Sequence, residues 1–146
     1  MLVMKELDDT YQKNLLENLK VYDTLKTNTN NNKKISYGYF EDDKLIAGIK
    51  ASIEGYKVMY IETLFVDENY RKHGLGKMLM KIIEEHAKFE GVLVIRLDTF
   101  SWQAKDYYES LGYELIGTYL IDENYSEYFY VKRIWKSRRI LLLSFL

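Results

Sequence analysis

Apolar residues recur at helical spacing in two long segments of the chain. Residues 8–25 carry one apolar face, and Asp8 or Asp9 stands where it could cap the start of a helix. That face consists of Tyr11, Leu15, Leu16, Leu19, Tyr22 and Leu25. Residues 74–90 show the stronger amphipathic pattern, and Gly91 follows where a left-handed C-cap costs little. The apolar face of this second segment consists of Leu75, Met78, Leu79, Ile82, Ile83 and His86.

Runs of β-forming residues alternate with these helices. The pattern predicts a third helix over 103–111 and strands over 35–40, 44–53, 57–66, 92–97, 113–120 and 126–135. The run 58–66 is nearly continuous in β-formers, which is typical of a central strand covered on both faces. A strand, a helix and a strand in succession imply a right-handed crossover to a parallel neighbour. The sequence therefore predicts one α/β domain with a mixed sheet over 1–135 and a tail over 136–146.

Composition narrows the classes of function. The chain has 146 residues, of which 47% are hydrophobic, and this length suits one domain rather than two. It contains no cysteine, which excludes disulfides, cysteine-ligated metals and cysteine nucleophiles, and its two histidines argue against a histidine-rich metal site. The chain shows no signal peptide and no apolar run of membrane-spanning length, so we expect a cytoplasmic protein.

Charge is unevenly distributed along the chain, whose formal net charge is −1. All 22 acidic residues precede Lys132, whereas five of the 21 basic residues lie at or after it, which gives −6 before that residue and +5 from it onward. The acidic main part disfavours nucleic acid as a partner. For the basic and apolar tail, the alternatives are contact with a membrane surface, an interface in a homodimer, an added strand or no role.

The junction between the central strand and the amphipathic helix carries candidate chemistry. Gly74 and Gly76 let the backbone approach a bulky ligand, and the free N–H groups at a helix start favour an anion. Arg71, Lys72 and Lys77 add positive charge, so the sequence predicts a phosphate or pyrophosphate site. The third glycine of a dinucleotide-binding fingerprint is missing here, and so is the Ser or Thr that a P-loop requires.

Two longer motifs lie on the predicted elements. The first is Arg71-x-x-Gly74-x-Gly76, after a strand that ends at Val66, and the second spans residues 104–114. They resemble the pyrophosphate loop and the A-x-x-F-Y-x-x-x-G-F/Y segment of the GNAT superfamily of acetyl-CoA-dependent N-acetyltransferases, with tyrosine in place of phenylalanine at position 107. The run 97–104 is similar to a D-T-F-S-F-Q-A run in a small bacterial subgroup. The resemblance implies the GNAT fold, a mostly antiparallel sheet with one parallel, splayed strand pair and flanking helices.

The resemblance also implies acetyl-CoA as co-substrate and no metal. Backbone groups of Leu64, Phe65 and Val66 would pair with the pantetheine arm, as an added strand does. Ser101 stands where many relatives carry an asparagine that touches this arm, and Ala104 opens the second motif. The pyrophosphate would lie on the backbone amides of Arg71, Lys72, His73, Gly74, Leu75, Gly76 and Lys77.

Two residues are implied to be catalytic. Tyr108 occupies the position of the general acid, where a phenol is protonated at neutral pH, and the alternative role is a packed aromatic. Glu62 interrupts an apolar strand, on the face of Leu64 if the period is two, and an unpaired buried carboxylate is costly. It resembles the glutamate of polyamine acetyltransferases, which implies a base, and the alternative is an ion-pair partner. We expect His86 to be a satisfied core residue and His73 a pyrophosphate contact or an exposed residue.

These features lead us to expect direct transfer of an acetyl group from acetyl-CoA to a primary amine. Glu54 and Glu62 favour a small cationic acceptor. The alternatives are a protein N-terminus or lysine side chain and an aminoglycoside or streptothricin-like drug. From a different class, the domain could bind acyl-CoA without turnover, as a sensor or interaction module.

Overall fold

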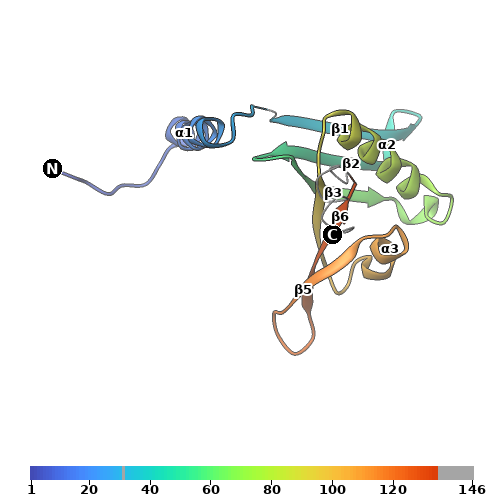
Figure 1. Ribbon diagram of the computed structural model, residues 1–146. Helices are drawn as coiled ribbons and strands as arrows, with labels where there is room; N and C mark the ends of the chain where they lie inside the picture. The colour runs from blue at the N-terminus through green and yellow to red at the C-terminus, as the bar shows by residue number, and fades with distance from the viewer. Residues whose placement is uncertain (31, 135–146) are drawn as a thin grey trace, which may run out of the picture.

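The sheet has six strands, and its order places β3 and β4 side by side near the centre. The computed structural model describes residues 1–30 and 32–134. The spatial order is β1-β2-β3-β4-β6-β5 (Figure 1), and within the described residues all neighbours are antiparallel except β3 and β4. The strands are β1 (Lys33–Glu41), β2 (Lys44–Glu54), β3 (Val58–Val66), β4 (Val94–Phe100), β5 (Glu114–Leu120) and β6 (Ser126–Arg133). The predicted mixed sheet is therefore confirmed.

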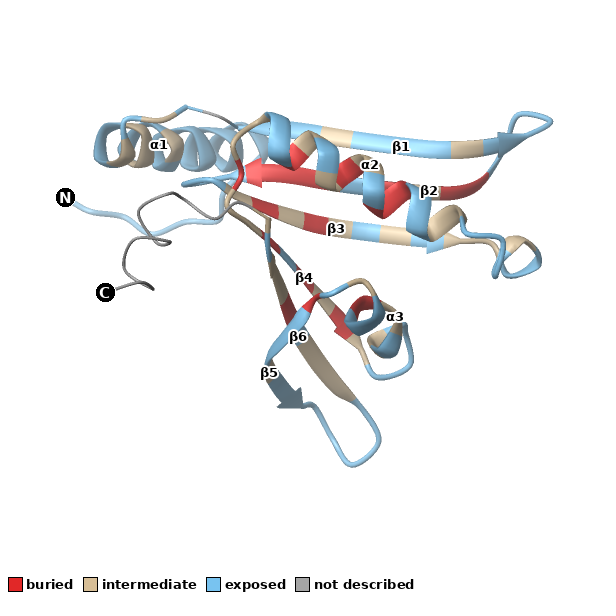
Figure 2. Ribbon diagram, turned by 45° about the vertical axis from the view of Figure 1, so that its right-hand side comes forward, coloured by how far each residue is buried: buried red, intermediate tan, exposed pale blue. Residues whose placement is uncertain are grey.

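β3 and β4 pair over only a short length. Their parallel register runs from Val58 opposite Val94 to Tyr60 opposite Arg96, and it continues no further within the described residues. The C-terminal half of β3 pairs with β2 alone, whereas that of β4 pairs with β6 alone. Figure 2 shows the sheet dividing into two parts that diverge from this junction. The parallel, splayed strand pair implied by the sequence is present.

A β-bulge in β3 lies beside Glu62. Lys50 and Ala51 are consecutive in β2, but they pair with Thr63 and Ile61, which leaves Glu62 between them without a cross-strand partner. The extra residue reverses the alternation of β3, so that Ile61 before the bulge and Leu64 after it both pack on the core. The expectation that Glu62 shares the face of Leu64 was wrong, because it assumed an uninterrupted period of two.

Helix α2 (Leu75–Phe89) covers one face of β1, β2 and β3 (Figure 1). The predicted apolar face is correct at Leu79 and Ile83 but wrong at Met78, which is 53% exposed. The helix turns a neighbouring stripe to the sheet, so its buried residues are Leu79, Met80, Ile83 and Ala87. His86 is half-buried, and its Nε2 lies 2.6 Å from the hydroxyl oxygen of Tyr37. It is a satisfied histidine at the margin of the core.

The connections around β4 explain where this strand begins and ends. Gly91 has a φ of 72°, and the N–H of Val92 donates to the carbonyl oxygen of Ala87, so these residues complete the turn after α2. The strand therefore starts at Val94 and not at Val92, and its pairing with β6 extends it to Phe100. Helix α3 (Lys105–Ser110) follows and buries Tyr108.

Helix α1 (Asp9–Thr27) lies beyond the end of the sheet (Figure 1). Its predicted cap is confirmed, because Oδ1 of Asp8 accepts a hydrogen bond of 3.0 Å from the N–H of Tyr11. No residue of α1 is buried, and Leu15 and Leu25 are 62% and 79% exposed, so its apolar face is left unpacked. Among the described residues no helix is long and apolar enough to cross a membrane. The predicted tail over 136–146, with its interface alternatives, lies outside the described residues.

Ile83→Ala tests the assignment of the buried face of α2. The side chain is fully buried, so we expect the free energy of unfolding to fall by about 2–4 kcal/mol, from lost transfer free energy and the cavity left behind. Met78→Ala on the exposed face is the matched control and should change it by less than about 0.5 kcal/mol. Urea unfolding followed by circular dichroism measures both variants, and equal losses would contradict the assignment.

Candidate active site

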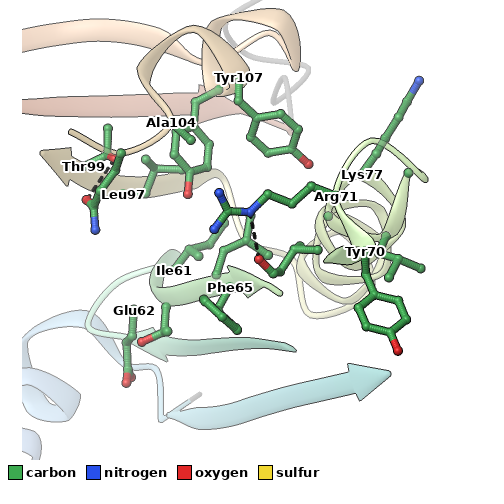
Figure 3. Close-up of a pocket in the computed structure, with 18 of the residues that line it drawn as sticks. Ile61, Glu62, Phe65, Tyr70, Arg71, Lys77, Leu97, Thr99, Ala104 and Tyr107 are labelled. Atoms are coloured by element: carbon green, nitrogen blue, oxygen red, sulfur yellow. Dashed lines mark hydrogen bonds between the residues drawn. The ribbon is translucent and has the colours of Figure 1, made fainter. Parts of the chain in front are cut away.

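A cavity of about 960 Å³ lies where β3 and β4 part. Its walls come from the C-terminal half of β3, the following loop, the start of α2, the end of β4 and α3 (Figure 3). The residues proposed from the sequence that line it are Glu62, Leu64, Phe65, Val66, Arg71, Lys72, Gly74, Leu75, Gly76, Lys77, Ala104 and Tyr108. The splayed strands thus bring together residues that are up to 46 positions apart, from Glu62 to Tyr108.

Two proposed residues, His73 and Ser101, do not line this cavity. His73 belongs to the exposed part of the loop. The Oγ of Ser101 accepts a hydrogen bond of 3.1 Å from the N–H of Ser126, and the N–H of Ser101 donates to the carbonyl oxygen of Ser126 at 2.8 Å. These bonds make Ser101 the link between the end of β4 and the start of β6.

The loop between β3 and α2 has the geometry of an anion site. Arg71 Nε donates to the carbonyl oxygen of Val66 at 3.0 Å, which ties the loop back to the end of β3 (Figure 3). Gly74 caps α2 with a φ of 82°, a left-handed conformation that favours glycine. No side chain caps this helix, so the N–H groups of its first turn and its positive dipole end face the ligand space. A Cβ at Gly74 would meet no atom within 4 Å, so the loop borders open space.

These features fit two parts of acetyl-CoA, the co-substrate that the sequence implied. The uncapped amides and the cationic Arg71, Lys72 and Lys77 suit a pyrophosphate. The apolar wall formed by Leu64 and Val66 suits the pantetheine arm. The described residues contain no group of three or more His, Asp or Glu side chains placed to hold a metal ion.

Tyr108 reaches the cavity from α3 and is only 7% exposed. Its ring lies 5.5 Å from that of Tyr107 and 6.2 Å from those of Tyr113 and Tyr130, measured between ring centroids. Burial raises the pKa of Tyr108 to about 12. The phenol therefore keeps its proton well above neutral pH. Tyr108 is a packed aromatic residue that also lines the cavity, and its hydroxyl is a proton donor.

Glu62 is paired with Lys50. Its Oε2 lies 2.8 Å from Nζ of Lys50, and this hydrogen bond holds the pKa of the Glu62 carboxyl below its ordinary value. The ion-pair alternative from the sequence is therefore present in the structure. Glu62 also lines a second hollow of about 340 Å³, between α1 and strands β1 to β3. It is the boundary between this hollow and the main cavity.

Charges of both signs surround the second hollow. Glu54 lines it together with Glu62, and so do Lys20, Lys34 and Lys50. The hollow is not strongly acidic. The sequence alone did not indicate this mixture of charges, because the fold brings Lys34 of β1 and Lys50 of β2 to the same hollow as the two glutamates.

Sequence reasoning gave no role to several residues at the parting strands. The hydroxyl of Tyr60, the last residue of β3 to pair with β4, donates to Oδ1 of Asp98 at 2.8 Å. Asp98 also acts on Glu127 of β6, because partial desolvation and the neighbouring Asp98 carboxyl raise the pKa of Glu127. Asp98 lines the main cavity. The sequence held one signal for it: Asp98 stands between Leu97 and Thr99, which are buried, so its side chain belongs to the opposite face of β4.

The comparisons with known proteins agree with this geometry. Residues 2–113 match the family model described as the acetyltransferase (GNAT) family. The chain is 24% identical over 111 residues to acetyltransferase Atu2258 of Agrobacterium fabrum, across 76% of this chain and 81% of that protein. The structure of an acetyltransferase from Bacillus cereus covers 90% of this chain and 97% of its own, with a TM-score of 0.74 and 26% identity.

A further solved structure contains the expected co-substrate. It is a candidate streptothricin acetyltransferase from Bacillus anthracis in complex with acetyl coenzyme A. The match covers 73% of this chain and 64% of that one, with a TM-score of 0.61 and 24% identity. At this identity the likeness shows a shared fold.

Arg71→Ala tests the anion loop. We expect the Kd for CoA to rise about tenfold, because the substitution removes both a cation and the bond that ties the loop to Val66. Isothermal titration calorimetry measures the affinity, and Lys81→Ala, on the exposed side of α2, should leave it unchanged. Equal affinities of the Arg71 variant and the unmodified protein would show that the Arg71 side chain contributes nothing to binding of the phosphates.

Proposed function

The chain belongs to the acetyltransferase (GNAT) family, and from this premise we propose that it acetylates the primary amine of a small cationic molecule. The co-substrate of the reaction is acetyl-CoA. One observation carries the proposal: a single cavity joins the uncapped start of α2 to a buried, protonated tyrosine at the point where two central strands part.

The binding step uses the backbone more than the side chains. In the proposal, the C-terminal half of β3 pairs with the pantetheine arm, because β4 has left that edge without a partner. The amides from Arg71 to Lys77 hold the pyrophosphate at the start of α2. When bound, acetyl-CoA supplies the activated acyl group. These two anchors put its thioester at the parting of the strands, within reach of α3.

The chemical step is a direct displacement at the acyl carbon. A backbone N–H of β3 stabilises the negative charge that develops on the carbonyl oxygen as the amine nitrogen attacks. Tyr108 gives its hydroxyl proton to the sulfur as the carbon–sulfur bond breaks, so that a neutral thiol leaves. The acylated nitrogen then loses its extra proton, and a proton returns to the Tyr108 phenolate, so that a neutral amide and the original phenol result. The acceptor must first lose a proton, because an alkyl ammonium has a pKa of about 10.4.

Glu62 takes up that proton through an intervening water. Its lowered pKa makes it a weak base but keeps it ionised at neutral pH, so it also attracts an ammonium group. Lys50 is 55% exposed at its side chain, so a cationic acceptor can take its place beside the carboxylate. The position of Glu62 between the cavity and the second hollow supports this role.

Other acceptors and one other class of function remain alternatives. The lysines around the second hollow favour a partner that also carries acidic or polar groups, such as a peptide N-terminus. A streptothricin-like drug is supported by the name of the Bacillus anthracis relative. An acyl-CoA-binding module without turnover is disfavoured by the proton donor at the cavity wall.

A panel of amines distinguishes these functions. CoA release from acetyl-CoA is followed with a thiol reagent, to which the cysteine-free chain adds no background. Turnover on polyamines or related cations supports the proposal. Turnover confined to peptides or to drugs would show that the acceptor belongs to that class and is not a small cation. If there is no turnover but acetyl-CoA raises the melting temperature, the protein binds acyl-CoA without catalysis.

Tyr108→Phe tests the general acid. We expect kcat to fall by about 10²–10⁴-fold, because the leaving sulfur loses its proton donor, while the Kd for acetyl-CoA changes less than about twofold. Tyr119→Phe on the exposed β5 is the matched control and should retain full activity. Initial rates of CoA release on the best amine of the panel measure both. An unimpaired Tyr108 variant would leave Tyr108 with a packing role only.

A comparison of Glu62→Gln with Lys50→Met tests whether Glu62 acts as a base or only as the ion-pair partner of Lys50. If Glu62 accepts the proton, its loss should lower kcat/KM about 10–100-fold at neutral pH, with a smaller deficit as the pH approaches the pKa of the amine. Lys50→Met should then retain turnover, because it frees the carboxylate. Equal effects of the two substitutions, on unfolding and not on rate, would show that the pair is structural.

A further inference from the structure

Tyr107 has a buried hydroxyl with no hydrogen-bond partner among the described residues. The residue precedes Tyr108 on α3 and extends toward the start of α2, with its oxygen on the side of Arg71 and Lys77 (Figure 3). A Cβ built at Gly76 would lie 2.9 Å from this oxygen. The hydroxyl therefore rests directly against the first turn of α2, and only a glycine leaves room for it.

A phenylalanine would fill the same space without this unpaired group. Leaving a buried hydroxyl unpaired is unfavourable, since it loses its bonds to water and gains none. Burial also raises the pKa of Tyr107, so the group stays a neutral donor. A buried donor with no partner among the described residues thus lies beside the uncapped amides of α2.

We propose that Tyr107 is a positioning residue for the pyrophosphate of acetyl-CoA, an inference that rests on the proposed function. An anion on the free amides of the first turn of α2 would lie next to the Tyr107 ring. A small displacement of the ring or of the loop carries the hydroxyl from its contact with Gly76 to a phosphoryl oxygen, to which it donates. Binding then removes the unfavourable unpaired state, so the ligand-bound form gains more from this hydroxyl than the free form does.

Tyr107→Phe tests the proposal through stability and binding. The melting temperature of the free variant should be equal to or higher than that of the unmodified protein. The Kd for CoA, measured by calorimetry, should rise about five- to tenfold. ADP, which carries a pyrophosphate without the pantetheine arm, should lose affinity by a similar factor, whereas pantetheine should bind equally well to both proteins.

Tyr113→Phe is the matched control, because its buried hydroxyl is paired with Glu84 at 3.3 Å. This variant should melt at a lower temperature and bind CoA normally. A Tyr107 variant that melts lower with unchanged CoA affinity, or that loses pantetheine and CoA affinity alike, would overturn the proposal. If the unmodified protein binds no CoA at all, the proposed function itself fails.

Gly76→Ala gives an independent check on the contact. In the unmodified background the added methyl group meets the Tyr107 oxygen, so it should lower the melting temperature. In the Tyr107→Phe background the nearest ring atom is the Cζ carbon, 3.5 Å away, so the loss should be smaller. Equal losses in the two backgrounds would show that the hydroxyl does not press on this turn.

Discussion

The early end of pairing between β3 and β4 is the constraint on which the site depends. Hydrogen bonding between parallel strands would normally continue along both, but here it stops at Tyr60 opposite Arg96. Each strand keeps its other neighbour, so neither half of the sheet unravels. The parting leaves backbone groups of β3 free for a ligand and opens the cavity that α2 and α3 border.

Two local features lie where the strands part. The bulge at Glu62 changes the direction of β3 just after its last pair with β4. Tyr60 then donates across the junction to Asp98, so the strands are joined by side chains at the point where their backbones separate. Around the cavity, Glu62 comes from β3, whereas Asp98 comes from β4 and Tyr108 from α3. The parting therefore brings an ionisable side chain of each part of the sheet to one cavity.

Much of this arrangement could be predicted from the sequence. The strands and helices follow from local periodicity, and the loop with Gly74 and Gly76 follows from the chemistry of a helix start. Three features could not be read in this way. The bulge at Glu62 is invisible to a rule of alternation, the exposed Met78 reflects how α2 is rotated on the sheet, and the pairing of Lys50 with Glu62 depends on strand register.

Amide hydrogen exchange with and without CoA tests whether the ligand enters between the parted strands β3 and β4. If the ligand enters between the parted strands, peptides covering residues 63–67 of β3 and 71–78 at the start of α2 should become protected together, and α1 and β5 should not change. Protection confined to α1 and the second hollow, or an absence of protection at CoA concentrations that saturate binding, would contradict this account.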